Sequence, residues 1–174
     1  GKVKSAAMMQ AARLLHSILR CHPPSVAALA PVLGHVLTIL HVDVQEEALA
    51  AAVPEGPDRR KHRLAHPPSE SHSVVAQLLS VLARAFVQDP ANFMAVCAQW
   101  ESTQSGSPAP PPSVAGFQTL LMVATAWAER IENLAEDRSG LAPTPWRRKL
   151  TAMALMGTLK LMCDAAMQPA GRIA

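Results

Sequence analysis

Residues 113–162 decide the fold, and they read SVAGFQTLLMVATAWAERIENLAEDRSGLAPTPWRRKLTAMALMGTLKLM. The first part places apolar residues three or four positions apart, which predicts a helix with one apolar face. The polar residues 136–140 predict a turn, and Thr144 followed by Pro145 predicts a capped start of a second helix. Residues 150–162 are apolar nearly all round. We therefore expect a helical hairpin whose second helix is covered by other helices on more than one side.

The composition favours an all-α chain. The 174 residues are enough for one domain with its own core, and 49% of them are apolar. Aromatic residues make up only 3%, so the core must be built mainly of leucine, valine, alanine and methionine. Alanine and leucine are strong helix formers. Valine and isoleucine do not alternate with polar residues over a useful length, which argues against strands.

Further helices are expected outside the hairpin. Apolar residues recur at helical spacing in residues 3–19, 25–53, 73–87 and 91–100. Pro23 and Pro24 end the first of these helices, because the residue before a proline avoids helical geometry. Pro31 either kinks the second helix or marks its true start. Asp89 and Pro90 separate the last two, with the aspartate as a cap and the proline at the first helical position.

These helices suggest units of about forty residues, the length of a helical repeat. We expect HEAT-like antiparallel helix pairs that form an α-solenoid segment, with a closed bundle as the alternative, and the chain length does not decide between them. The expected division of the chain is a helix pair at 1–53, a loop rich in proline and basic residues at 54–72, HEAT-like helices at 73–168 with a Ser/Pro spacer at 101–112, and a tail at 169–174.

Charge and cysteine content restrict the function classes. The net charge of +3, from 16 basic and 13 acidic residues, is too small to indicate a nucleic-acid partner. No signal peptide is visible, and no uninterrupted apolar run reaches the ~18 residues of a membrane span, so no membrane insertion is expected. Cys21, Cys97 and Cys163 lie far apart, which predicts buried reduced thiols in a cytosolic or nuclear protein. The way the chain begins and ends suggests a piece of a larger protein.

No residue pattern predicts a catalytic, cofactor or metal site. His62 and His66 are four residues apart, but no glutamate lies between them and no third ligand is near, so solvated histidines are the expected reading. The basic run at 59–63 could bind anions or direct nuclear localisation, although a solvated loop explains it as well. No nucleophile elbow or glycine-rich anion loop occurs.

Two charged runs flank the turn of the hairpin. Acidic residues 129, 132, 136 and 137 are spaced for pairing with Arg130 and Arg138 on a helix surface, or they face a basic partner. Arg147, Arg148 and Lys149 open the second helix, where positive charge is unfavourable because that end is already positive. We expect either the acidic end of the preceding helix or an acidic partner to hold these three residues.

The same hairpin carries a resemblance to a known family. Residues 127–134, WAERIENL, followed by residues 147–155, RRKLTAMAL, resemble the C-terminal HEAT repeats of importin-β-type nuclear transport receptors, nearest the importin-eleven branch. The shared pattern is W-x-x-R-x-x-N and then R-R-K-L-[ST]-A-x-A-L. The resemblance covers about residues 74–162, and the Pro-rich stretches at 54–72 and 101–112 depart from it.

The resemblance implies a non-enzymatic receptor that binds protein cargo, the Ran GTPase and nuclear pore proteins, in the cytoplasm and the nucleus. No residue here matches the family's principal Ran-binding surface, so no Ran contact is assigned. The candidate structural or partner-surface residues are Trp127, Arg130, Arg147, Arg148 and Lys149. Two alternatives stay open: an unrelated helical-repeat scaffold for traffic, translation or chromatin, and a helical enzyme domain whose catalytic residues lie elsewhere. We also expect marginal stability in isolation, because both end helices should expose apolar faces.

Overall fold

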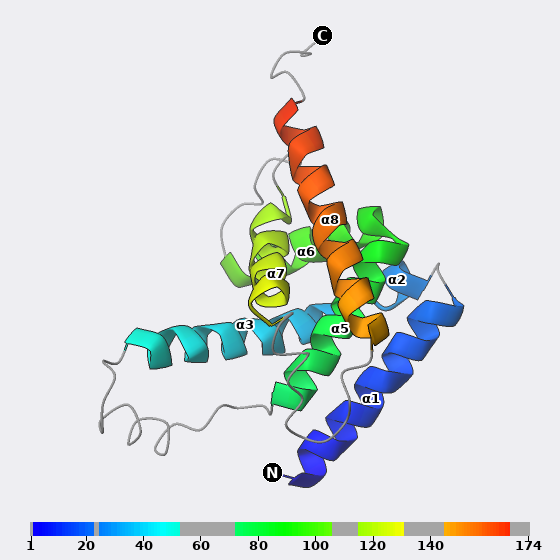
Figure 1. Ribbon diagram of the computed structural model, residues 1–174, viewed down its shortest axis with the longest axis vertical. Helices are drawn as coiled ribbons and strands as arrows, with labels where there is room; N and C mark the ends of the chain where they lie inside the picture. The colour runs from blue at the N-terminus through cyan, green and yellow to red at the C-terminus, as the bar shows by residue number, and fades with distance from the viewer. Residues whose placement is uncertain (1, 23–24, 53–71, 106–114, 131–144, 168–174) are drawn as a thin grey trace.

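The structure is a computed structural model that describes residues 2–22, 25–52, 72–105, 115–130 and 145–167. These residues form helices and no strand, so the predicted all-α class is confirmed for them (Figure 1). The helices are α1 (Lys2–Cys21), α2 (Ser25–Ala28), α3 (Ala30–Ala52), α5 (His72–Gln88), α6 (Pro90–Ser105), α7 (Phe117–Arg130) and α8 (Pro145–Met167).

The central helix is α5, and not either helix of the predicted hairpin. It contacts α1, α3, α6, α7 and α8 (Figure 1). Burial extends around nearly all of its circumference and includes the polar side chains of Gln77 and Ser80. The sequence predicted a single apolar stripe on this helix, as on a surface helix. Its small and polar residues are nevertheless enclosed, because neighbours pack on every side of it.

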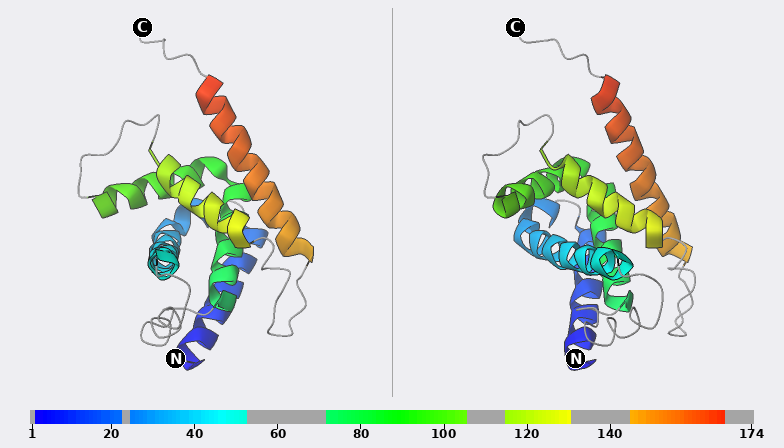
Figure 2. Two further views of the ribbon diagram at one scale, coloured as in Figure 1. Left: turned by 60° about the vertical axis from the view of Figure 1, so that its left-hand side comes forward. Right: turned by 90° about the vertical axis from the view of Figure 1, so that its left-hand side faces the viewer.

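Those neighbours come from both ends of the chain. α1 packs along α5, and α8 packs on α5 as well (Figures 1 and 2). α1 and α3, the two long helices of the predicted pair at 1–53, make their main contacts with α5 and α6 respectively. In a solenoid each unit touches only its neighbours along the chain. The HEAT-like stacking is therefore not confirmed, and the arrangement around α5 has the character of the closed-bundle alternative.

Several predicted helix boundaries are confirmed. α1 ends at Cys21, just before the two prolines, and Pro31 lies in the first turn of α3, which makes it the true start of that helix. The backbone N–H of Asn92 donates to Oδ1 of Asp89 over 3.1 Å, so Asp89 caps α6 as expected. Pro145 is the first residue of α8.

α6 is longer than predicted, because residues 101–105 are helical and do not belong to the spacer. The Glu101 carboxylate accepts hydrogen bonds from the N–H groups of Gly116 at 2.8 Å and Thr119 at 2.7 Å. These donors lie at the start of α7, where backbone N–H groups lack partners within the helix. Gly116 has a φ of +85°, and a Cβ there would lie 2.8 Å from the carbonyl oxygen of Met94. Glu101 thus fastens α7 against α6.

α8 is covered on one side only by the described residues, which differs from the expectation. Leu150, Thr151, Ala154 and Thr158 are its buried residues. Its C-terminal half stands clear of the other helices (Figures 1 and 2). The apolar composition of α8 reflects a packed face and a second, exposed apolar face, and not enclosure by neighbours.

The cysteine prediction holds for one residue of three. Cys97 is buried, whereas Cys21 and Cys163 are exposed, so the expected burial is wrong for these two. Cys21 is the last residue of α1, and Cys163 lies on the half of α8 that has few neighbours. Burial raises the pKa of the Cys97 thiol to about 12, so this thiol stays protonated and unreactive.

Several predicted features lie outside the described residues. These are most of the loop at 54–72 with His62 and His66, most of the spacer at 101–112, the turn between α7 and α8 with Thr144, and the tail at 169–174.

Candidate functional site

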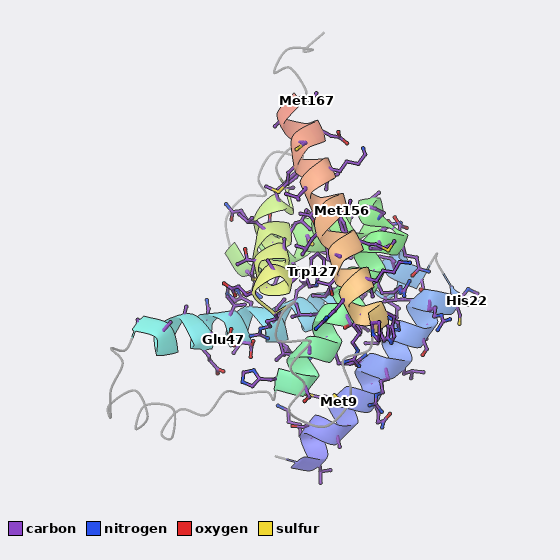
Figure 3. All side chains as sticks on the ribbon, viewed as in Figure 1. Met9, His22, Glu47, Trp127, Met156 and Met167 are labelled. Carbon is purple, nitrogen blue, oxygen red and sulfur yellow. The ribbon has the colours of Figure 1, made fainter. Side chains whose placement is uncertain are left out.

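An exposed apolar face runs along α8 on the side away from the bundle. Met156 is 71% exposed and Leu159 63% exposed, although both are large apolar residues in the middle of a helix. Met156 and Met167 project from α8 in Figure 3. The large apolar residues of this face are Met153, Met156, Leu159, Met162 and Met167. Large exposed apolar side chains gathered on one helix are typical of an interaction site.

A hollow of about 300 Å³ lies beside this face, between α8 and the junction of α5 with α6. Its lining is mainly apolar, and its charged lining residues are Lys160 and Asp164. Their side chains form an exposed ion pair at 2.8 Å. Gly157 lies against Phe86, because a Cβ there would be 2.8 Å from Cε1 of the ring. The lining residues are Phe86, Val87, Pro90, Met153, Gly157, Lys160, Leu161 and Asp164. An apolar side chain of a partner fits such a hollow.

Trp127, one of the predicted site residues, has a structural role. Its side chain is fully buried, and its indole N–H donates to the backbone carbonyl of Leu79 on α5 over 3.0 Å. The ring also packs near Phe86, with 6.2 Å between centroids. Figure 3 shows Trp127 at the centre of the helices. It fixes α7 against α5 and offers no surface to a partner.

Arg130 is also internal, and the structure corrects its expected pairing on the helix surface. Its Nη2 lies 2.5 Å from Oδ2 of Asp43 and 2.7 Å from Oε1 of Glu47, both on α3. Arg130 lies three residues after Trp127 and so shares its buried face, whereas Glu129 is exposed. Burial raises the pKa of Asp43, and the hydrogen bond from Arg130 opposes that rise. Burial lowers the pKa of Arg130, but hydrogen bonds to the two carboxylates outweigh it and raise that pKa.

The three basic residues at the start of α8 have different surroundings. Arg148 and Lys149 are exposed. Arg147 is half-buried, its Nη2 donates to Oε1 of Gln77 on α5, and its guanidinium lies 5.5 Å from the centroid of the Trp146 ring. The acidic residues 132, 136 and 137, one of the two expected ways of holding this run, lie outside the described residues.

His16, which no sequence motif indicated as a site residue, is buried beside this run. Its ring lies 4.8 Å from the Trp146 ring, centroid to centroid. The pKa of His16 is lowered from 6.5 to about 4, first by burial and then by the charges of Arg84, Arg147 and Arg20. The sequence did contain a signal for the burial of His16. It lies four residues after Ala12 and three before Leu19, on the apolar face of α1. Asp43 had a similar signal, as a carboxylate within an apolar stretch of α3.

The described residues bring together no group of three His, Cys, Asp or Glu side chains able to hold a metal ion. Among them, α8 is the one helix long and apolar enough to cross a membrane by length and composition, a test that core helices of soluble proteins also pass. No protein-family model, curated protein or solved structure matches the chain. The candidate site is therefore assigned from geometry, as the exposed face of α8 with its adjoining hollow.

Proposed function

We propose that the chain is a non-enzymatic, protein-binding segment of a nuclear transport receptor that acts in Ran-dependent import of protein cargo. The observation that carries the binding role is the exposed apolar face of α8 beside the apolar hollow. Burying such a face against a partner removes apolar surface from water, which is the main favourable term in protein association. Methionine side chains, which dominate this face, adapt to partners of different shape.

The charges around this face indicate the chemistry of the partner. Arg148, Lys149 and Lys160 are exposed on α8, and Asp164 is the one acidic residue of that helix. A partner with an apolar stripe bordered by acidic residues is complementary to it. We propose an acidic amphipathic helix whose apolar side chain enters the hollow next to Gly157, the helix-in-groove mode of recognition.

The transport role rests on the resemblance of residues 127–134 and 147–155 to importin-β-type receptors. Trp127 and Arg130 of that pattern are internal and join α7 to α5 and α3. α7 and α8, which contact each other, would form one HEAT-like pair of a longer solenoid. Cargo, pore proteins and Ran would then bind to the full-length receptor in cytoplasm and nucleus. The alternative is an unrelated helical scaffold, and the arrangement of five helices around α5 favours it.

Two measurements test this proposal. Full-length protein should be captured by immobilised Ran loaded with GTP and not by Ran loaded with GDP. Failure of that capture, with binding through α8 intact, would leave the scaffold alternative. For the face itself, binding of an acidic amphipathic peptide helix is measured by fluorescence anisotropy with the Met156→Glu/Leu159→Glu variant.

The matched control is Leu49→Glu, which introduces the same charge at a residue that is 66% exposed on α3. We expect the α8 variant to lower the affinity at least tenfold, because it places carboxylates opposite an acidic partner, and the control to leave it within about twofold. Equal affinity of both variants would rule out α8 as the binding face. Binding of the chain to phospholipid vesicles instead of the peptide would reassign the face to a membrane surface.

A further inference from the structure

Positive charge gathers around a buried histidine where α1, α5 and the first turn of α8 meet. We call this the basic junction, and it consists of His16, Arg20, Arg84 and Arg147. The three arginines are close enough to His16 to lower its pKa by charge repulsion. Burial lowers the pKa of Arg84, and the charge of Arg20 lowers it further. Neither Arg20 nor Arg84 forms an ion pair with another described residue.

The basic junction contains buried polar atoms that lack hydrogen-bond partners in the described part of the chain. Nε2 of His16 and Nε of Arg84 are among them. The His16 residue is only 9% exposed. Buried polar groups without partners are costly and uncommon in native proteins. A ligand that accepts hydrogen bonds would satisfy the arginine and, in one tautomer, the histidine.

The start of α8 adds further positive potential at the same place. α8 begins at Pro145 and has no acidic residue in its first turn. The first N–H groups of a helix have no partner within it, and the helix dipole makes this end attractive to anions. Trp146, in that first turn, lies beside both His16 and Arg147. The helix end, the arginines and the unpartnered atoms thus meet in one place.

We propose that the basic junction binds a phosphate-type oxyanion carried on a phosphorylated side chain of a partner protein. Guanidinium groups match the oxygens of phosphate with paired hydrogen bonds, and several of them around one helix N-terminus suit a doubly charged group better than a single carboxylate. The oxyanion site stands on its own geometry. Only its assignment to a partner protein rests on the proposed protein-binding function.

The first test follows His16 itself by NMR, using the intact chain with ¹⁵N-labelled histidine. An anion beside the imidazole favours its protonated form. Adding inorganic phosphate should therefore raise the pKa of His16 by one pH unit or more, with half-saturation below about 5 mM. Sodium chloride at equal ionic strength is the control for screening. A pKa of His16 that is unchanged by phosphate in the folded chain would overturn the proposal.

The second test uses variants of the basic junction. Arg20→Gln and Arg84→Gln should each weaken phosphate binding at least fivefold, and Arg20 is exposed, so the fold does not depend on it. Arg148→Gln removes the same charge from an exposed position on α8 and should change the affinity less than twofold. Equal weakening by Arg148→Gln would show general attraction of anions and would refute a defined site.

The source of the oxyanion is tested separately. A glycine-flanked phosphoserine peptide should bind at least as tightly as inorganic phosphate, and its unphosphorylated form should not bind. Binding of inorganic phosphate without binding of the peptide would overturn the partner assignment, while leaving the α8 face untouched. A last variant replaces the acidic residues between α7 and α8 with amides, as Glu132→Gln/Glu136→Gln/Asp137→Asn. If it binds phosphate tenfold more tightly than the wild-type chain, the chain itself supplies the anion, and the partner assignment would be overturned.

Discussion

The close contact of α8 with α5 at Gly157 leads to a prediction about stability. Replacing Gly157 with alanine would place a Cβ 2.8 Å from Cε1 of Phe86. The Phe86 ring is 2% exposed and lies against Phe93 and Trp127, with centroid distances of 5.6 and 6.2 Å. It has little room to retreat on the core side. Overpacking of this kind costs about 1–3 kcal/mol.

The same substitution has a favourable component, because alanine is a better helix former than glycine by about 1 kcal/mol. Gly34→Ala isolates that component, since nothing lies within 4 Å of a Cβ placed at Gly34 on α3. Gly34→Ala should therefore stabilise the chain by about 0.5–1 kcal/mol. The helix-propensity gain cancels between the two variants, so the difference between them measures the packing cost at Gly157.

The assay is thermal unfolding followed by circular dichroism, on the wild-type chain and both variants. A difference of about 1–3 kcal/mol corresponds to a Tm of Gly157→Ala roughly 2–12 °C below that of Gly34→Ala. Phe86→Leu, which removes the ring, should shrink the penalty of Gly157→Ala when the two are combined. Equal Tm values for the two alanine variants, or a penalty that persists without the ring, would refute the assignment of a tight α5–α8 contact.

Two further predictions concern buried charge. Arg130→Met leaves Asp43, whose side chain is 4% exposed, without its main partner, and should lower the free energy of unfolding in urea by about 3–5 kcal/mol. Adding Asp43→Leu should recover most of this loss. No recovery would contradict the ion-pair account. The pKa of His16 is about 4 in the folded chain and 6.5 in the unfolded chain, so the folded chain binds a proton there less readily. The stabilising contribution of His16 is therefore complete above pH 6.5 and is lost as the pH falls towards 4. The difference corresponds to about 3 kcal/mol at most. His16→Gln should therefore flatten the fall of Tm between pH 6.5 and 4, and a slope equal to that of the wild-type chain would count against this account.

The existence of most helices could be predicted from the sequence, because it depends on local signals. Pro23, Pro31, Asp89 and Pro145 act through their own backbone geometry or through the next few N–H groups, so their effect is readable without tertiary information. The end of α6 was misjudged for a different reason. Glu101, in the helical extension, accepts hydrogen bonds from Gly116 and Thr119, which lie fifteen and eighteen residues later in the chain. No local sequence pattern reveals contacts over that separation.

The choice of the central helix could not be made from apolar content. Residues 150–162 are more uniformly apolar than α5, yet the described residues enclose α5 and cover α8 on one side only. An apolar helix surface is compatible with a position in the core and with a face that binds a partner. Only the packing of the other helices distinguishes these two cases. Arg130 shows the same limit. Its glutamate neighbours in the sequence predict a surface position, whereas the structure pairs it with the buried Asp43 on α3.

The two hydrogen bonds from α7 to Glu101 have a consequence for how the chain tolerates change. The Glu101 carboxylate holds the start of α7 against α6, so we expect the position of α7 to tolerate changes in the stretch between residues 105 and 115. Insertions, deletions or new chain ends introduced there would leave the two helices clasped together. This stretch is thus a suitable place to introduce a cut in the chain or to graft an epitope.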